Sequence, residues 1–233
     1  MTDLNQRIET LTQWMKECNK IIVFTGAGIS TDSGLPDFRG PDGVWTRRDK
    51  GLPPRDGNRD WTAVDPNIAH YAVHELQQMD KLKFLISQNI DNLHLKSGIR
   101  FELLAELHGN MARARCMVCE KTFPKEEQIE RCDECGGSMK SSVIHFGDSL
   151  PQKDLTDSFE QAQDCDLFIV IGSSLVVTPA ATIPRVAYEA GARLVIINKG
   201  ETPLDSIADL RFDESIADVF PVAVEKLKNL IRV

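Results

Sequence analysis

Long hydrophobic runs are missing from this sequence, and so is an excess of positive charge. The longest apolar runs, such as residues 167–171, are far shorter than the roughly 20 apolar residues that cross a bilayer. The 233 residues carry 27 basic and 35 acidic side chains, a net charge of −8. A protein dedicated to nucleic acid needs a basic surface. We therefore expect no membrane span and no dedicated nucleic-acid binding.

A secretory signal is also lacking, because the first residues are polar and acidic rather than basic and then apolar. Neither end shows a lipidation motif. Four of the 6 cysteines form two Cys-x-x-Cys pairs, and Cys18 and Cys165 are left over. In a reducing compartment such pairs indicate metal binding rather than disulfides. We expect a cytoplasmic protein.

Apolar runs typical of buried strands alternate with helical patterns along the chain. Buried strands are predicted at residues 21–24, 84–86, 167–171 and 194–197. Helices are predicted over residues 4–15, 67–79, 155–162, 179–190 and 219–231. This alternation predicts an α/β fold, a Rossmann-like parallel sheet with helices on both faces.

Two stretches interrupt the alternation. Residues 40–65 are rich in Gly, Pro, Asp and Arg, which predicts a long loop. Residues 113–142 contain the paired cysteines and almost no core-forming aliphatic side chains, so we interpret them as a small zinc-ribbon-like module inserted in the larger domain.

The paired cysteines are the strongest single signal. Cys116 and Cys119 precede Cys132 and Cys135, and two such knuckles form a tetrahedral tetrathiolate zinc site. Four thiolates leave no open coordination position, so one structural Zn²⁺ is expected. A redox pair or unrelated thiols are the alternative.

A glycine turn follows the first predicted strand. Small residues at 26–28 would let backbone amides approach a diphosphate, and the start of the next helix would favour negative charge. The dinucleotide-binding fingerprint of dehydrogenases has a third glycine where this chain has Thr31. It also has an acidic residue that binds the ribose, where this chain has Ser-Gln-Asn at residues 87–89. Hydride transfer therefore fits badly, and a tight turn without a ligand stays open.

Other polar clusters also stand at the carboxyl ends of predicted strands or close after them. In an open parallel sheet these ends converge on one crevice, where ligands bind. The clusters lie at residues 34–41, 88–91, 107–109, 146–148, 172–175 and 198.

Together these motifs resemble the sirtuin family of NAD-dependent protein lysine deacylases, from about residue 21 to residue 220. The motifs that carry the resemblance are Gly-Ala-Gly-Ile-Ser at 26–30, Asp-Phe-Arg at 37–39, Gln-Asn-Ile-Asp at 88–91, His-Gly at 108–109, the cysteine knuckles and Gly-Ser-Ser at 172–174. Residues 40–46 and the compact knuckle spacing are most similar to the class IV branch.

The resemblance implies a deacetylase, with long-chain deacylation open, that consumes NAD and releases nicotinamide and O-acyl-ADP-ribose. His108 corresponds to the family's base for the ribose hydroxyls. Asn89 would order water and the ribose, and Asp91 with the Ile90 backbone would hold the nicotinamide carboxamide. The implied catalytic residues are His108, Asn89 and Asp91.

The resemblance also implies the residues that contact the two substrates. The NAD-binding residues would be Gly26, Ala27, Gly28, Thr31, Asp37, Phe38, Arg39, Trp45, Gln88, Asn89, Ile90, Asp91, Gly172, Ser173, Ser174, Asn198 and Ile216. An acyl-lysine protein or peptide would add a strand beside Phe146, Gly147, Leu175, Val176 and Val177. As bare sequence features, Arg39 could be a surface ion-pair partner, Trp45 a loop anchor and Ile216 a core residue.

The expected organisation is a single sirtuin catalytic domain over residues 1–233. A large Rossmann-like NAD-binding lobe would comprise residues 1–40, 82–112 and 143–233. Residues 41–81 would form a loop and helical part of the small lobe, and residues 113–142 its zinc-binding module. Two other functions stay open: protein mono-ADP-ribosyl transfer, and a non-catalytic NAD-binding interaction protein.

Overall fold

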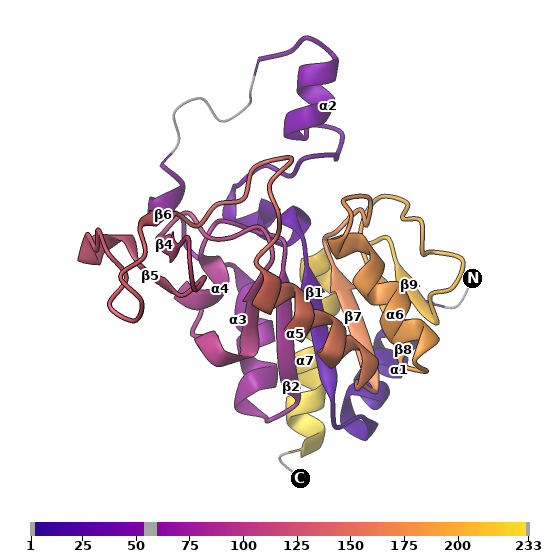
Figure 1. Cartoon of the computed structure of the whole chain (residues 1–233). Helices are drawn as coiled ribbons and strands as arrows, with labels where there is room; N and C mark the ends of the chain where they lie inside the picture. Colours follow the sequence, from indigo (N-terminus) through magenta and orange to yellow (C-terminus); the bar gives the residue numbers. More distant parts are fainter. Residues whose placement is uncertain (1–2, 54–59, 232–233) are drawn as a thin grey trace.

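A six-stranded sheet forms the centre of the computed structural model, which describes residues 3–53 and 60–231 (Figure 1). Its strands are β1 (Ile21–Thr25), β2 (Leu82–Ser87), β3 (Leu104–Glu106), β7 (Leu167–Ile171), β8 (Arg193–Ile197) and β9 (Leu210–Phe212). All neighbouring pairs are parallel, in the order β3-β2-β1-β7-β8-β9. The order reverses direction at β1 and β7, as in a doubly wound Rossmann sheet.

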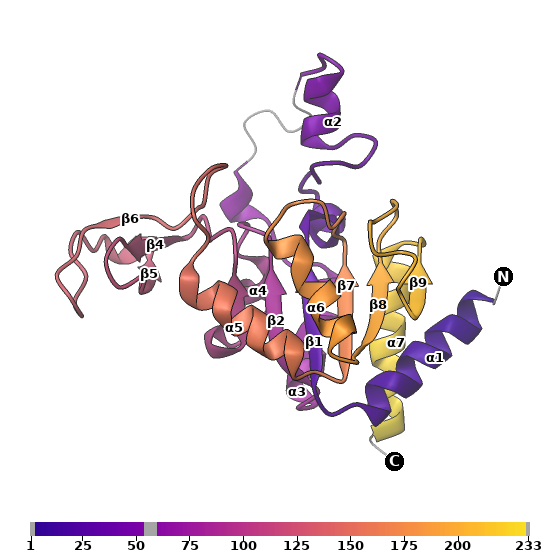
Figure 2. The ribbon, with the colours of Figure 1, turned by 45° about the vertical axis from the view of Figure 1, so that its right-hand side comes forward.

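Helices cover both faces of this sheet (Figures 1 and 2). One set is α1 (Leu4–Glu17), α3 (Ile68–Gln78) and α7 (Ile216–Ile231), and the other is α5 (Gln152–Gln163) and α6 (Ile183–Glu189). Alternate side chains of β1 face the two cores, because successive strand residues point to opposite faces. Ile21 and Val23 pack in the first core, whereas Ile22 and Phe24 pack in the second. The predicted fold class is confirmed.

A second, three-stranded antiparallel sheet holds the cysteine segment and lies beside the main sheet (Figure 2). Its strands are β4 (Arg113–Cys116), β5 (Thr122–Pro124) and β6 (Met139–Ser141). The buried core of this sheet is Cys116, Phe123 and Cys132, with Ile129 and Met139 packed against it. So small a core gives little hydrophobic stabilisation, which makes a metal the expected source of stability.

The stretch predicted as a loop at residues 40–65 contains helices, so this prediction is wrong in part. Helix α2 (Val44–Asp49) projects from the body of the molecule (Figure 1), and Trp61–Ala63 form a 3₁₀ turn. The amide of Val44 donates to the Asp37 carbonyl, and the amide of Trp45 donates to the Phe38 carbonyl, both at 2.9 Å. Residues 54–59 of this stretch lie outside the described residues.

Short helices complete the connections between strands. They are the 3₁₀ segments Ala27–Ser33, Phe101–Leu103, Lys125–Glu127 and Ala180–Thr182, and helix α4 (Leu93–Lys96). Over residues 3–53 and 60–231, none of the helices has the length and apolar content that a bilayer requires.

Candidate NAD and peptide site

A cavity of about 1250 Å³ opens at the carboxyl ends of the main strands. Its lining includes the loops after β1 and β7, the two strands at which the strand order reverses. In an open α/β sheet this switch point is where ligands bind. The fold alone therefore places a binding site here.

The loops after β1 and β7 contact each other through their backbones. The Gly28 amide donates to the Gly172 carbonyl at 2.9 Å. A Cβ on Gly28 would lie 2.7 Å from the Gly172 Cα. Gly172 has φ +65, and a Cβ there would lie 2.4 Å from the Ile29 nitrogen. Glycine is thus required at both positions for the loops to meet, besides any approach of a diphosphate.

His108 lines the cavity in a fixed orientation. Its Nδ1 lies 2.9 Å from the Gln88 carbonyl oxygen, which can only accept, so Nδ1 carries the hydrogen. Nε2 is then the unprotonated nitrogen of the neutral ring. Burial lowers the pKa of His108 from 6.5, opposed by the hydrogen bond to Gln88. The ring is therefore neutral at pH 7, with one nitrogen able to accept a proton.

Ser30 connects two of the predicted catalytic residues, and it was not among the predicted site residues. Its hydroxyl donates to Asp91 Oδ2 at 2.7 Å and lies 3.2 Å from Asn89 Nδ2, from which it accepts. The Leu93 amide donates to Asp91 Oδ1 at 2.9 Å. Burial raises the pKa of Asp91, and the hydrogen bonds from Leu93 and Ser30 oppose this shift. Its place after the glycine turn was the available sequence signal for Ser30.

An aromatic row in the cavity lining connects the Asp-Phe-Arg motif with the Phe-Gly motif. The Trp45 ring centroid lies 5.2 Å from that of Phe38 and 5.2 Å from that of Phe146. The Arg39 guanidinium lies 4.6 Å from the Trp45 centroid. Asp37 stabilises the turn that follows, accepting from the Gly40 amide at 3.0 Å. Trp45 is therefore packed between a predicted NAD contact and a predicted peptide contact.

Every predicted catalytic, NAD-binding and peptide-binding residue lies in the lining of this one cavity. The strand-end residues are Gly26, Ala27, Gly28, Thr31, Gln88, Asn89, Ile90, Asp91, Gly172, Ser173, Ser174 and Asn198. The remaining lining residues of the prediction are Asp37, Phe38, Arg39, Trp45, His108, Phe146, Gly147, Leu175, Val176, Val177 and Ile216. One cavity therefore brings all of these residues together, as predicted, while the role of each residue stays a prediction.

The four paired cysteines converge in the small sheet. Their sulfur atoms all lie within 4.8 Å of one another, with Cys116 Sγ 3.5 Å from Cys135 Sγ, and Cys119 Sγ 3.6 Å from Cys132 Sγ. Tetrahedral zinc with four thiolates at about 2.3 Å places its sulfurs roughly 3.8 Å apart. The Val118 amide also points at Cys116 Sγ at 3.4 Å. The cluster therefore fits a structural Zn²⁺.

Comparisons with known proteins identify the same family along nearly the whole chain. The Sir2 family profile matches residues 54–179. An NAD-dependent protein deacetylase of Thermodesulfovibrio yellowstonii is 37% identical over 250 residues, covering 97% of each chain. NAD-dependent protein deacylase 2 of Archaeoglobus fulgidus is 39% identical, covering 97% of this chain and 98% of its own. The rice deacetylase SRT1 is 41% identical, but this chain spans 45% of its length.

Solved structures agree with the sequence comparisons. A structure from work on the mechanism and regulation of Sir2 enzymes has a TM-score of 0.79 and 37% identity, covering 97% of this chain and 99% of its own. A Sir2 complex with p53 peptide and NAD⁺ has a TM-score of 0.71 and 31% identity, covering 97% of both chains. A cavity at the switch point, a four-cysteine cluster and these likenesses lead to one conclusion. The chain belongs to the Sir2 family, whose matched relatives are NAD-dependent protein deacetylases and deacylases.

Proposed function

We propose that this chain removes acyl groups from protein lysine side chains with NAD as the acyl acceptor. Acyl-lysine, NAD and water would give lysine, nicotinamide and O-acyl-ADP-ribose. The observation that carries this proposal is the single cavity that joins His108, the two glycine loops and the exposed Phe146. When bound, NAD supplies a ribose carbon that can be attacked and nicotinamide as the leaving group.

His108 acts as the general base in this proposal. Because Nδ1 donates to the Gln88 carbonyl, Nε2 accepts a proton from a ribose hydroxyl. Its lowered pKa keeps the ring neutral at physiological pH, so no proton has to leave before the ring can act. Ser173 supports the same loop, since its hydroxyl donates to Gln88 Oε1 at 2.6 Å.

Asn89 and Asp91 hold the nicotinamide end of NAD. The Asn89 amino group donates to Ser30, which leaves its carboxamide oxygen to accept from water or the ribose. Asp91 keeps a fixed orientation through Ser30 and Leu93, so it can accept from the nicotinamide carboxamide together with the Ile90 backbone. Such fixed polar groups stabilise charge that develops in a water-poor site.

The remaining lining residues bind the rest of NAD. Ala27, Gly28 and Thr31 would contact the diphosphate, with the Arg39 cation beside it. Phe38 and Trp45 would shield the ribose from water. Contacts to phosphate, ribose and adenine would come from Gly26, Asp37, Gln88, Gly172, Ser173, Ser174, Asn198 and Ile216.

The acyl-lysine peptide lies between two rims of the cavity. Phe146 is 80% exposed and Val176 44% exposed, as expected for side chains that a partner covers. One rim consists of residues 146–147 and the other of residues 175–177. The Leu175 side chain is buried in the core, so only its backbone would contact the peptide, and Gly147 and Val177 lie beside the exposed residues. Pairing through backbone hydrogen bonds tolerates many peptide sequences.

The same proposal includes the class IV assignment, the lobes and the compartment. The large lobe (1–40, 82–112 and 143–233) would bind NAD, and residues 41–81 and 113–142 would form the small lobe. The free thiols and the thiolate cluster suit a reducing cytoplasm. The net charge of −8 gives no support to nucleic acid as a dedicated partner.

The direct test is mass spectrometry of acetyl-lysine and long-chain acyl-lysine peptides incubated with the protein, with and without NAD. We expect NAD-dependent loss of the acyl mass and the appearance of O-acyl-ADP-ribose. ADP-ribose attached to protein, with unchanged peptides, would replace the proposal by transferase chemistry. Intact NAD and intact peptides would favour a binding role.

A further inference from the structure

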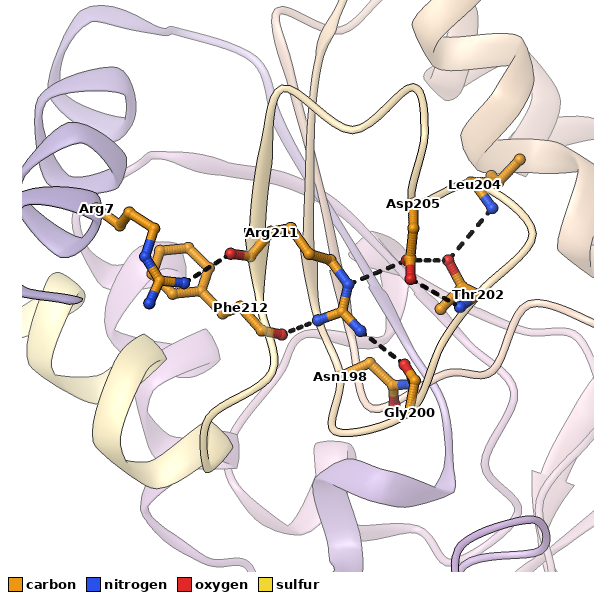
Figure 3. Close-up of polar contacts among 8 residues, drawn as sticks. All are labelled: Arg7, Asn198, Gly200, Thr202, Leu204, Asp205, Arg211 and Phe212. Atoms are coloured by element: carbon orange, nitrogen blue, oxygen red, sulfur yellow. Dashed lines mark hydrogen bonds and ion pairs between the residues drawn. The ribbon is translucent and has the colours of Figure 1, made fainter. Parts of the chain in front are cut away.

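The loop after β8 borders the cavity. One arginine of the next strand, Arg211, forms hydrogen bonds to this loop (Figure 3). Residues 198–201 of this loop line the cavity at the edge of the sheet formed by β8 and β9. Arg211 lies on β9 and is not among the lining residues of the cavity. Any effect of Arg211 on a bound ligand must therefore pass through another residue.

The Arg211 guanidinium donates in three directions. Its Nε donates to Asp205 Oδ1 at 3.0 Å, its Nη2 to the Gly200 carbonyl at 2.6 Å, and its Nη1 to the Phe212 carbonyl (Figure 3). The side chain is 23% exposed, and its bonds to Asp205 and Phe212 are partly buried, whereas the bond to Gly200 is exposed. The planar fork of arginine suits such simultaneous contacts, whereas a lysine ammonium does not.

Asp205 is itself fixed to the same loop. Its Oδ1 accepts from the Thr202 hydroxyl at 2.6 Å, and its Oδ2 accepts from the Thr202 amide at 3.1 Å. The Thr202 hydroxyl in turn accepts from the Leu204 amide at 3.3 Å. Arg211 therefore joins two fixed points of the loop, the Asp205 carboxylate and the Gly200 carbonyl.

The Gly200 carbonyl determines how Asn198 is oriented. Asn198 Nδ2 donates to this oxygen at 2.8 Å, so the carbonyl accepts from both Asn198 and Arg211. Because a carbonyl cannot donate, the amino group of Asn198 must face it and not the amide oxygen. The amide oxygen and the second amino hydrogen of Asn198 are then left for a ligand, and the oxygen, which carries no hydrogen, accepts from hydroxyl groups.

We propose that Arg211, aligned by Asp205, is a positioning residue that fixes Asn198 as a hydrogen-bond acceptor for the adenosine ribose of NAD. This role rests on the proposed NAD site, and it explains how the side chain that would bind the adenosine ribose is held in place. Without Arg211, the Gly200 carbonyl would lose one of its two donors, and Asn198 could rotate with the loop. NAD would bind more weakly, while the chemistry at His108 would be unchanged.

The test is steady-state kinetics of Arg211→Gln against NAD and an acyl-lysine peptide. We expect KM for NAD to rise roughly five- to twenty-fold, as for the loss of one or two hydrogen bonds. We expect kcat and KM for the peptide to stay within about twofold. The affinity for ADP-ribose, measured by calorimetry, should fall in parallel. Arg211→Lys should give an intermediate loss.

A double-mutant cycle with Asn198→Ala separates positioning from mere support of the strand. If Arg211 acts through Asn198, the double variant should bind ADP-ribose no more weakly than Asn198→Ala alone. Additive losses would overturn the proposal, as would a fall in kcat with unchanged KM for NAD.

Arg7→Gln is the matched control for loss of stability. Arg7 donates to the Arg211 carbonyl at 2.8 Å and stacks over the Phe212 ring at 5.1 Å, but it does not contact Gly200 (Figure 3). This variant should lower the melting temperature and leave KM for NAD within about twofold. An equal rise in KM for Arg7→Gln would overturn the specific role of Arg211. If the wild type binds ADP-ribose without consuming NAD, the proposed function fails and the cycle still tests Arg211 on affinity alone.

Discussion

At the scale of single residues, the chemistry of the cavity depends on which nitrogen or oxygen atom of each side chain has no hydrogen-bond partner within the protein. His108 keeps Nε2 free because Nδ1 is committed to Gln88, and Asn89 keeps its carboxamide oxygen free because its amino group is committed to Ser30. These commitments come from contacts distant in the sequence. They fix donor and acceptor roles before any ligand arrives.

The pH dependence of catalysis follows from the state of His108. Burial lowers its pKa from 6.5, so the acid limb of kcat/KM should fall below pH 6.5 rather than at it. His108→Ala should lower kcat by roughly 10²- to 10⁴-fold, because general-base catalysis is lost. Initial rates between pH 5 and 8.5, with circular dichroism of the variant, check both statements. A folded variant with wild-type turnover would remove His108 from the mechanism.

At the scale of elements, the sequence predicted those strands whose burial is continuous. The runs that became β1, β2, β7 and β8 are apolar nearly throughout, and each of their ends was predicted within one residue, except that β2 begins two residues earlier. Strands β3 and β9 have three residues each and include Glu106 and Arg211, so only their neighbours in the sheet define them. Helix α2 was missed because six residues between Gly- and Pro-rich flanks give no periodic pattern.

For the site, the sequence predicted which residues line the cavity, but it did not predict the contacts between their side chains. Motifs at strand ends predicted which residues would gather, because parallel strands end at one edge. The contacts of Ser30 and the Arg211–Asp205–Gly200 network join residues by side-chain geometry alone. No spacing rule indicates such contacts, so the structure was needed to find them.

Removal of zinc should unfold the small sheet and also reach the active site. The Ser142 hydroxyl donates to the Asn110 carbonyl at 2.7 Å and accepts from the Asn110 amide at 2.9 Å. The Ile144 amide, two residues further on, donates to the His108 carbonyl at 2.9 Å. Cys119→Ser should therefore lose zinc, amide protection of residues 113–142 and most activity. Binding free energy on the order of ten kcal/mol is lost with such sites.

Hydrogen exchange with mass spectrometry and metal analysis measure these effects. Residues 167–171, in the centre of the main sheet, should keep their protection. Cys165→Ser is the matched control, because Cys165 lies outside the cluster. Within the described part of the chain, its thiol forms one hydrogen bond, to the Ala162 carbonyl. A zinc-free Cys119→Ser protein with full activity would disprove the structural role of the metal.

At the scale of the whole molecule, buried titratable groups set how stability varies with pH. Burial lowers the pKa of His70 to about 4, and burial raises the pKa of Glu106 to about 7. His70 packs against the ring of His94, with centroids 5.1 Å apart, and Glu106 accepts from Asn110 Nδ2 at 2.6 Å. The two shifts act on stability in opposite directions.

Two variants separate these contributions. The folded state resists protonation of His70, so its contribution is present above pH 6.5 and is lost as pH falls from 6.5 towards 4. Glu106 stays protonated longer in the folded state, so its contribution is present below pH 4.5 and is lost as pH rises through 7. In each of these pH ranges, the contribution of the group to the free energy of unfolding should change by up to about 1.4 kcal/mol per pH unit.

Urea unfolding between pH 4.5 and 8 measures the free energies. Relative to His70→Asn, the wild type should lose stability as the pH falls below 6.5. Relative to Glu106→Gln, it should lose stability as the pH rises from 4.5 to 7. Parallel curves for the wild type and either variant would show that the corresponding group has the same pKa in both states.

The aromatic row also gives the protein an optical reporter of its own. The Trp45 indole contacts Phe38 on the side predicted for NAD and Phe146 on the side predicted for the peptide. Trp14 stacks under Arg193 away from the cavity, whereas Trp61 lines it. With Trp14 and Trp61 replaced by phenylalanine, the fluorescence of the remaining indole would follow the arrival of either ligand without a label. The order in which the two substrates bind would then be readable from emission alone.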